Sequence, residues 1–488
     1  MFKRKFQFCI VVVCYLFIVS CQKESFSTSG DIKLKFVPDT ISFDTIFTTF
    51  GSTTQSLRVK NPSAQSINIS RIYLAGGEDS PFRLNINGVR NFEDQNVRLS
   101  GGDSLYIFVE VTVDPTDQGD PLLVHDSIIF ELNGHQQDLD LIAYGQDFHL
   151  LKGDVLSTQH WQNDKPYLIY NSVLVDSTAT LSINPGCRIY FHHGASLFVK
   201  GTLNVNGTFE EPVQFLGDRL EHYYDDKPGQ WGAVRILEDQ SKYVFGGIHF
   251  LAGSKNNKID YAIIKNANKG IQVDSVGDSN NPELVLSNTI IENMTLNCLD
   301  ARTTRVKADN CIFANSGSYC VALRFGGQYE FDHCTIADYY EAATRQDPAL
   351  ILNNYYQYNN TIYAFDLQKA DFSNCIIYGS YGGDGDELLL AGTPESQFNY
   401  QFQNCLIKTN ATYAQEAEFT HSIFNKNPSF RGIKNNDYAL DSLSPARNVG
   451  DVEVAKQFPL DLNQKSRLAD EGPDLGALEW VSSKEFEK

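Results

Sequence analysis

The sequence predicts an all-β protein, most of which is a right-handed parallel β-helix, and two observations carry this prediction. The first is an eight-residue phrase that recurs through the middle of the chain. Its copies are NKIDYAII, LVLSNTII, VKADNCIF, YEFDHCTI, ADFSNCII, YQFQNCLI and AEFTHSIF, which begin at Asn257, Leu284, Val306, Tyr329, Ala370, Tyr400 and Ala417. The second is the spacing of 22 or 23 residues between the most regular copies. That spacing suits one turn of a solenoid and is too short for a domain.

The phrase itself describes a bent pair of strands. Positions 1 and 3 are mostly apolar, as in a strand with one buried face. Position 5 is Asn or His in every copy after the first, position 6 is small, and position 8 is always Ile or Phe. The inward-facing residues therefore shift from odd to even positions across position 5. This shift requires a bend, and Asn tolerates the left-handed backbone of a bend better than other non-glycine residues. Position 7 is also apolar in most copies, which periodicity alone does not explain.

The order of strand, Asn bend, strand and turn resembles the pectate-lyase-like β-helix family, in which stacked Asn side chains form a ladder along one bend. The resemblance implies a right-handed β-helix over residues 155–440. Longer intervals between copies would be coils with inserted loops, and the last interval is short for a full coil. A β-sandwich of meandering strands is the alternative, but a sandwich would not repeat a bend residue at a fixed offset. Residues 441–488, with Asp474–Ala477 (DLGA), resemble the closing segment of secreted β-helix proteins and are expected to cap the last coil.

Residues 1–21 resemble a bacterial lipoprotein signal peptide. Lys3, Arg4 and Lys5 precede the apolar stretch Phe8–Val19, and the sequence Ile-Val-Ser-Cys ending at Cys21 resembles a lipobox. The resemblance implies cleavage before Cys21 and acylation of its thiol and amine, and several acyl chains hold a protein on a membrane stably. The alternative, an ordinary transmembrane anchor, is disfavoured because a dozen apolar residues are too few to span a bilayer. We expect a lipid-anchored protein on the periplasmic or extracellular face of the outer membrane.

Residues 22–34 are polar and would form a tether. Residues 35–147 contain short segments of alternating apolar and polar residues between turn signals, which predicts a separate strand-rich domain. Their order resembles the immunoglobulin-like domain of the spindle-protein and hydin type. The resemblance implies a β-sandwich that serves as a spacer or interaction module, and no catalytic constellation is visible in it.

Charge and cysteine content exclude some classes of function. The chain has 40 basic and 60 acidic residues, which argues against binding to nucleic acid and against electrostatic docking on anionic lipid. Seven of the ten cysteines remain after Cys9, Cys14 and Cys21 are set aside, so at least one thiol is unpaired. Four of the seven occupy position 6 of the phrase, where a small thiol suits the core. A disulfide between neighbouring coils is possible but not required, and no CxxC pair indicates a zinc site.

The main candidate for ligand binding is a row of arginines. Arg302, Arg324 and Arg345 are separated by 22 and 21 residues, so each could stand on the same face of successive coils. Stacked guanidinium groups repel unless an anion neutralises them, and Arg binds carboxylates or sulfates bidentately. The row could therefore bind an acidic polysaccharide, or an internal carboxylate such as Asp300, Glu341 or Asp347 could pair with it. A third interpretation gives Arg324 a catalytic part as a neutralising or abstracting group.

Two loops add weaker candidates. Tyr355 and Tyr356 lie in an aromatic insertion that could stack on sugar rings or pack the loop down. Asp384, Asp386 and Glu387 lie in the glycine-rich loop that begins at Gly382 and could hold a calcium ion through carboxylate oxygens, although a solvated loop is the simpler interpretation. No other cofactor is expected. Asp225 and Asp226 lie in a polar segment that we interpret as a loop and not as a catalytic pair.

These observations favour a cell-envelope lipoprotein whose β-helix binds a glycan or a surface protein without catalysis. The first alternative is a polysaccharide lyase or glycoside hydrolase that acts on an acidic polymer, although the clustered carboxylates that such chemistry needs are not evident. The second alternative is a structural or adhesin-like envelope protein.

Overall fold

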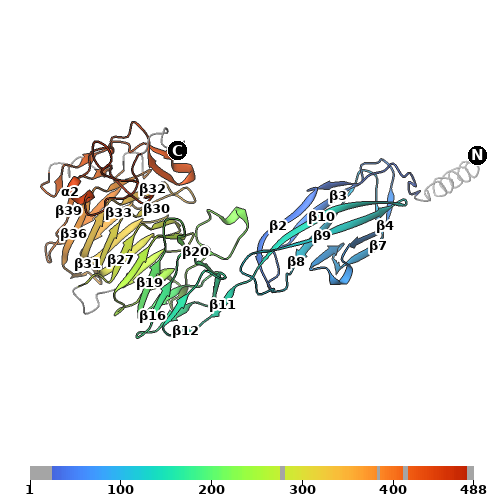
Figure 1. The fold of residues 1–488 in the computed structure, drawn as a ribbon, viewed down its shortest axis with the longest axis horizontal. Coiled ribbons are helices and arrows are strands. Elements are labelled where there is room, and N and C mark those ends of the chain that lie inside the picture. Colours follow the sequence, from blue (N-terminus) through green and yellow to red (C-terminus); the bar gives the residue numbers. More distant parts are fainter. Residues whose placement is uncertain (1–24, 275–280, 382–384, 410–415, 481–488) are drawn as a thin grey trace, which may run out of the picture. The chain divides into compact units, whose positions relative to one another are not determined.

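The computed structural model describes residues 25–274, 281–381, 385–409 and 416–480, and the chain divides into two compact units, Met1–Asp147 and Phe148–Lys488 (Figure 1). The described residues are almost entirely strands and turns, which confirms the all-β prediction. Their helical segments are α2 (Val452–Ala455) and the 3-10 turns η1 (Gly77–Asp79), η2 (His222–Tyr224) and η4 (Ile433–Asn435). Within these described ranges, no helix is long and apolar enough to cross a membrane.

The first unit is an immunoglobulin-like sandwich of two five-stranded sheets. One sheet consists, in spatial order, of β1 (Lys35–Val37), β3 (Gln55–Lys60), β8 (Ser104–Val111), β5 (Phe82–Ile86) and β6 (Val89–Asn91). The other consists of β2 (Thr40–Phe47), β10 (His135–Gln146), β9 (Leu122–Leu132), β4 (Ile67–Leu74) and β7 (Glu93–Leu99). Buried residues alternate along the strands, and those of both sheets, such as Val59 and Phe130, form one apolar core.

The second unit winds through two long parallel sheets. The 11-stranded sheet consists of β11 (His149–Lys152), β14 (Tyr167–Tyr170), β17 (Arg188–Phe191), β20 (Val213–Gly217), β25 (Ala262–Lys265), β28 (Ile290–Met294), β30 (Ile312–Ser316), β32 (Thr335–Asp338), β37 (Ile376–Gly379), β40 (Leu406–Ile407) and β42 (Ile423–Phe424).

The 17-stranded sheet contains the remaining strands of the coils. It consists of β12 (Val155–Leu156), β13 (Gln159–Trp161), β15 (Val173–Val175), β16 (Thr180–Ile183), β18 (Leu197–Val199), β19 (Thr202–Asn206), β23 (Ile248–Phe250), β24 (Asn257–Asp260), β26 (Ile271–Asp274), β27 (Leu284–Ser287), β29 (Leu299–Asp309), β31 (Val321–Asp332), β33 (Leu350–Asn353), β36 (Leu367–Ser373), β38 (Leu388–Ala391), β39 (Gln401–Gln403) and β41 (Phe419–Thr420). Every pairing within both long sheets is parallel, so the predicted right-handed parallel β-helix is confirmed (Figure 1).

The bend at position 5 has the predicted left-handed backbone in all seven copies. The residues and φ angles are Tyr261 (47°), Asn288 (48°), Asn310 (51°), His333 (49°), Asn374 (54°), Asn404 (48°) and His421 (51°). Their side chains also bond to one another along the bend: Asn310 Nδ2 donates to Asn288 Oδ1 at 3.1 Å, and Asn374 Nδ2 lies 3.0 Å from His333 Nε2. The Asn ladder therefore provides the left-handed backbone of the bend and also links neighbouring coils through side-chain hydrogen bonds.

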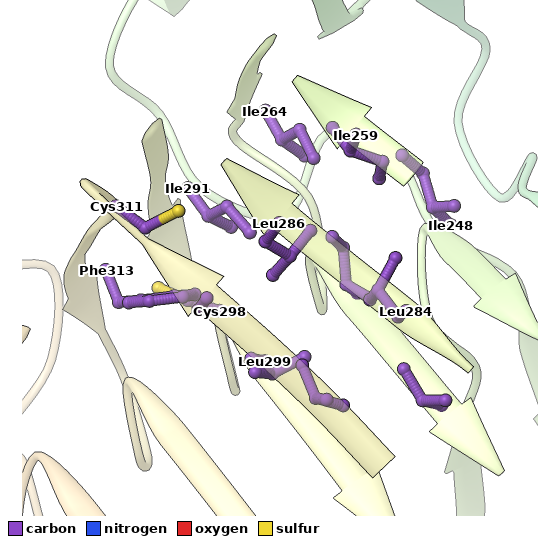
Figure 2. Packing of buried hydrophobic residues seen from close by; sticks show 14 of the residues in the cluster. Ile248, Ile259, Ile264, Leu284, Leu286, Ile291, Cys298, Leu299, Cys311 and Phe313 are labelled. Carbon is purple, nitrogen blue, oxygen red and sulfur yellow. The ribbon is translucent and has the colours of Figure 1, made fainter. Parts of the chain in front are cut away.

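Positions 3 and 8 line the interior of the β-helix. Figure 2 shows part of this core, where Ile264, Ile291 and Phe313 of position 8 are register neighbours on successive strands. At position 3, Phe372 and Phe402 stack with ring centroids 4.8 Å apart. The cysteines at position 6 are buried free thiols, as are the three others in the described residues: Cys187, Cys298, Cys311, Cys320, Cys334, Cys375 and Cys405.

Position 7 is apolar because the C-terminal segment covers it from outside. Ile312 packs with Tyr438 and Leu462, and Ile376 packs with Leu440 and Leu475, in two apolar clusters separate from the interior. We expected Asp474–Ala477 to cap the last coil, but the structure places this motif along the flank of inner coils. Gly476 N donates to Asn374 O at 2.7 Å, and Ala477 N donates to Thr335 Oγ1 at 3.0 Å.

Three antiparallel hairpins depart from the coils. They are β21 (Val234–Ile236) with β22 (Lys242–Val244), β34 (Tyr355–Tyr358) with β35 (Thr361–Ala364), and β43 (Phe430–Gly432) with β44 (Asp437–Leu440). The first two adjoin the 17-stranded sheet at the site described next, and the third belongs to the C-terminal segment.

Candidate functional site

Two adjacent rows of polar side chains stand on the outer face of the 17-stranded sheet. In the first row His249 of β23 pairs with Gln272 of β26, which pairs with Asp300 of β29. In the second row Asp274 of β26 pairs with Arg302 of β29, which pairs with Arg324 of β31. Register neighbours in a sheet are about 4.8 Å apart, and residues i and i+2 share a face, so the two rows form one polar cluster.

Asp300 is the centre of this cluster and is completely buried. Its Oδ2 lies 2.7 Å from Lys269 Nζ and 2.7 Å from Arg302 Nη2. Its Oδ1 accepts from Arg324 Nε at 3.0 Å and Nη2 at 2.5 Å. One carboxylate thus joins three cations, which resolves the repulsion expected for neighbouring arginines. Of the pairing partners considered from the sequence, Asp300 is the one that holds Arg302 and Arg324.

The β21–β22 hairpin covers this part of the outer face and buries it. The hydroxyl of Tyr243 in β22 accepts from Arg302 Nη1 at 3.1 Å and from Gln272 Nε2 at 3.2 Å. Gly246 N donates to Gln272 Oε1 at 3.1 Å, and a Cβ at Gly246 would lie 2.6 Å from the Gln272 side chain. The glycine therefore permits the close approach that covers His249, Gln272 and Asp300.

The electrostatics follow from this burial. Burial alone would raise the pKa of Asp300, but Lys269, Arg324 and Arg302 outweigh it and hold the pKa below its usual range. Burial lowers the pKa of Lys269, and the two arginines lower it further against the attraction of Asp300. Asp300 is therefore a fixed anion, and it cannot supply a proton near neutral pH.

A second carboxylate completes the cluster. Asp274 Oδ2 lies 2.7 Å from His249 Nε2, and Asp274 Oδ1 accepts from Gln272 Nε2 at 2.9 Å. Burial opposes ionisation of Asp274, yet hydrogen bonds from His249 and Gln272 lower its pKa. Among the described residues of this cluster, Lys269, Arg302 and Arg324 thus face two carboxylates, which leaves one positive charge in excess. The Arg302 and Arg324 side chains are 23% and 27% exposed, so this excess is accessible to solvent.

Arg345 does not continue the row, so the prediction from its spacing is wrong. Strand β31 pairs Leu323 with Leu352 of β33, which places Asn353 beside Arg324. Arg345 lies in the loop before β33, where its guanidinium contacts Asp338 Oδ2 at 3.2 Å and Glu387 Oε2 at 2.7 Å. An insertion between coils therefore breaks the regular spacing of 22 residues on which the prediction depended. Arg345 forms buried ion pairs with Asp338 and Glu387 that have a structural role.

The aromatic insertion lies beside Arg324. Tyr356 contacts Phe325, the residue after Arg324, with centroids 5.5 Å apart, and it stacks on Tyr363 at 4.8 Å. Tyr355 pairs with Ala364 at the base of the same hairpin. Both Tyr356 and Tyr363 retain exposed surface. The loop therefore packs on the sheet through Phe325 and still presents aromatic rings next to the exposed arginines.

The calcium candidate is only partly visible. Asp384 lies outside the described residues, as does the lipidation candidate Cys21. Glu387 is buried, and its Oε2 accepts from Arg345 and from Ala349 N at 3.0 Å. The described ranges contain no group of three or more His, Cys, Asp or Glu residues placed to hold a metal ion. Calcium binding that includes Asp384 stays a prediction.

The sequence singled out Arg302 and Arg324 but not Lys269, Asp274, His249 or Tyr243. Tyr243 and His249 lie on one coil and Lys269 and Asp274 on the next, and the insertions between the coils differ in length, so no fixed spacing joins these residues to the two arginines. The signal that could have found them is the unusual polarity of strands β23 and β26, where IHF and IQVD place His249, Gln272 and Asp274 between apolar residues.

A comparison with protein families agrees with the fold. A family model described as the right handed beta helix region matches residues 297–441. No curated protein matches the chain. Among solved structures, the ASH/PapD-like domain 7 of human CEP192 aligns at 9% identity and a TM-score of 0.17, covering 26% of this chain and 93% of that domain. A family 123 glycoside hydrolase from Clostridium perfringens aligns at 6% identity and a TM-score of 0.18, covering 25% of this chain and 26% of that enzyme.

Proposed function

We propose that this protein is a lipid-anchored envelope protein whose β-helix binds an acidic glycan without cleaving it. The binding surface consists of Arg302 and Arg324, with the exposed ring of Tyr356 beside them. The anchor would be acylated Cys21, and the protein would reside on the outer membrane. The parallel pairing of the coils sets equivalent side chains in rows along the sheet, an arrangement that suits an extended polymer.

The excess positive charge of the cluster carries this proposal. Three buried or half-buried cations face Asp274 and Asp300, and the two arginines keep part of their surface in solvent. Arg324 uses Nε and Nη2 on Asp300, which orients its guanidinium plane and fixes the direction of its remaining donors. A carboxylate or sulfate on a glycan would offset the excess charge through these donors. Aromatic rings next to a cation suit the apolar faces of sugar rings.

Asp300 favours binding over hydrolysis at this surface. A general acid needs a pKa near the working pH, whereas Asp300 is held ionised by three cations. The observation that favours the alternative, a lyase or hydrolase, is the contact between His249 and Asp274, because such a pair could move a proton. His249 is only 2% exposed, however, so a substrate would reach it only if the β21–β22 hairpin moved.

The test measures binding and cleavage on the same protein. The chain from residue 22 onward would be titrated with polygalacturonate, alginate, heparin and neutral dextran, with assays for new reducing ends and for unsaturated uronates. We expect binding to at least one acidic polymer, no cleavage, and an affinity at least about tenfold lower for Arg324→Gln, which loses a charged hydrogen-bond donor. Arg324→Lys should recover part of the loss by restoring the charge.

Arg90→Gln is the matched control, because Arg90 is an exposed arginine on the first unit that pairs with Glu110 at 2.9 Å. It should bind like the wild type. Cleavage products that disappear in a His249→Ala variant would establish the enzymatic alternative. If no acidic polymer binds, glycan binding at this surface is wrong, and the protein-binding and structural alternatives remain.

A further inference from the structure

A groove of about 450 Å³ lies on a different part of the β-helix, beside the 11-stranded sheet. Its lining includes Asn293 and Asn315, which lie on neighbouring coils near the ends of strands β28 and β30. Its walls come from three other places: the loop at Asp226, the segment at Tyr339 and Tyr340 after β32, and the C-terminal turn at Asn436. The volume falls within the range of small-molecule sites, about 300–1,000 Å³.

Hydrogen bonds between these segments fix the polar groups of the groove. Asn315 Nδ2 donates to Asn436 Oδ1 at 2.7 Å, and Asn315 Oδ1 accepts from Tyr339 N at 3.2 Å. Asn293 Nδ2 donates to Asp226 Oδ1 at 3.3 Å, and Lys265 Nζ lies 3.1 Å from the same oxygen. Four separate parts of the chain therefore hold one another in place around the groove, so its shape does not depend on a single loop.

The lining is charge-balanced, which selects the kind of ligand. Asp226 and Glu341 are exposed carboxylates, and Lys227 and Lys434 are exposed ammonium groups of the same lining. An anionic ligand would meet the carboxylates and a cationic one would meet the lysines. An apolar ligand would leave amides and carboxylates without water or hydrogen bonds, which is costly. A ligand with no net charge and many groups that both donate and accept hydrogen bonds fits this lining best.

Sugar hydroxyls have this property, and two tyrosines add the apolar surface that a sugar ring needs. Tyr339 packs edge-on against Phe430 with centroids 6.3 Å apart, so its ring is fixed, and Tyr340 is half-buried beside it. The Tyr340 ring provides a flat apolar contact while the carboxylates accept hydrogen bonds from the hydroxyls. Asp226 suits this task because Oδ1 is positioned by Lys265 and Asn293, and within the described chain Oδ2 accepts no hydrogen bond.

We infer that this groove is a second glycan site, specific for a short uncharged oligosaccharide and independent of the arginine surface. Asp226 and Glu341 accept hydrogen bonds from hydroxyl groups, and Tyr340 contacts a ring face. Asn293 and Asn315 hold the surrounding segments in place through the hydrogen bonds of their amides. The arginines belong to β29 and β31 of the 17-stranded sheet, so the two surfaces can be altered separately.

The test uses the chain from residue 22 onward and four neutral probes, namely maltotriose, cellotriose, mannotriose and triacetylchitotriose, with trigalacturonate as the acidic comparison. Calorimetry or saturation-transfer NMR should detect at least one neutral probe. Asp226→Ala and Tyr340→Ala should each weaken that binding about tenfold, the loss expected for a charged hydrogen bond or a ring contact. Arg324→Gln should leave it unchanged.

Matched controls are available for both variants. Glu395→Gln alters an exposed carboxylate outside the groove, and Tyr106→Ala removes a tyrosine that is 52% exposed on the first unit. Both should bind the neutral probe as the wild type does. The inference is overturned if none of the neutral probes binds, or if Arg324→Gln weakens neutral binding as much as Asp226→Ala does. Failure of trigalacturonate to bind would count against the arginine surface alone.

Discussion

Arg324 and Asp300 lie on neighbouring strands, and two donors of Arg324 bond to the same carboxylate oxygen of Asp300. Nε and Nη2 of Arg324 donate to Asp300 Oδ1 at 3.0 and 2.5 Å. Because Asp300 also receives Lys269 and Arg302 on its other oxygen, it acts as the common anion of three side chains on three different strands or turns. This arrangement allows two arginines to stand in register on adjacent strands, at a separation where they would otherwise repel.

Replacing Asp300 should therefore cost far more than replacing a surface carboxylate. Asp300→Asn leaves Lys269, Arg302 and Arg324 without their anion, and we expect a loss of about 3–5 kcal/mol in the free energy of unfolding. Asp371→Asn is the control, because its carboxylate meets Lys369 at 3.2 Å in an exposed pair and should cost less than about 1 kcal/mol. Urea unfolding of the β-helix transition measures both, and equal losses would contradict the structural role of Asp300.

The left-handed backbone of the Asn ladder predicts which of two variants at Asn288 is the more stable. Asn288 has a φ of 48°, where alanine is strained and glycine is not. Both Asn288→Ala and Asn288→Gly lose the hydrogen bond from Nδ2 to Asp260 Oδ1 at 2.9 Å. The glycine variant should therefore be the more stable of the two by about 1 kcal/mol, measured by thermal or urea unfolding.

Asn91 supplies the matched comparison. It is an exposed asparagine in β6 with an ordinary strand backbone, so glycine there should be less stable than alanine because glycine has more freedom in the unfolded chain. The same order at both positions would mean that the left-handed backbone does not determine the choice of Asn at the bend.

These features differ in how far the sequence could predict them. The bends and the interior columns were predictable because the residue type at each position depends on a local requirement. That requirement is a left-handed φ at the bend or an apolar side chain that points inward. Position 7 was not, because the residues that cover Ile376, such as Leu475, come about a hundred positions later. Arg345 was misplaced because the loop after Asp338 has no fixed length. The environment of Asp300 was only half predictable, since its third cation, Lys269, lies in the turn before β26, one coil earlier.

The lateral contact of the C-terminal segment can be tested at position 7. Ile376 is completely buried outside the β-helix interior, against Leu440, Ala446 and Leu475. Ile376→Ala should lower the free energy of unfolding by about 2–4 kcal/mol through the cavity that it leaves. It should also speed amide exchange at Gly476, whose N–H bonds to Asn374 O.

Ile423→Ala is the corresponding change in the last copy, where the side chain is only half-buried. It should cost less than half as much and leave the exchange of Gly476 unchanged. If Ile376→Ala destabilises the protein without faster exchange at Gly476, the segment is held by contacts other than position 7.

The last prediction concerns pH and two neighbouring carboxylates. Asp309 and Asp332 are register partners on β29 and β31. Burial, with the negative charge of Glu330 and Asp309 nearby, raises the pKa of Asp332 to about 7, and burial raises that of Asp309 to about 6. The unfolded pKa of an Asp is about 3.9, so the folded state holds a proton that the unfolded state releases. The contribution of Asp332 to stability is thus fully present below pH 4 and is lost as pH rises through about 7.

Asp332→Asn removes this pH-dependent loss. Relative to the wild type, the variant should gain about 1–2 kcal/mol in the free energy of unfolding between pH 5 and pH 8.5, after allowance for partial solvent screening. Asp309→Asn should show a gain of the same sign that is complete at a lower pH, because the folded pKa of Asp309 is about 6. Urea unfolding at several pH values measures both. A variant at Asp332 that becomes less stable than the wild type as pH rises would mean that the ionised carboxylate has a stabilising partner, and the effect of burial would then be the smaller one.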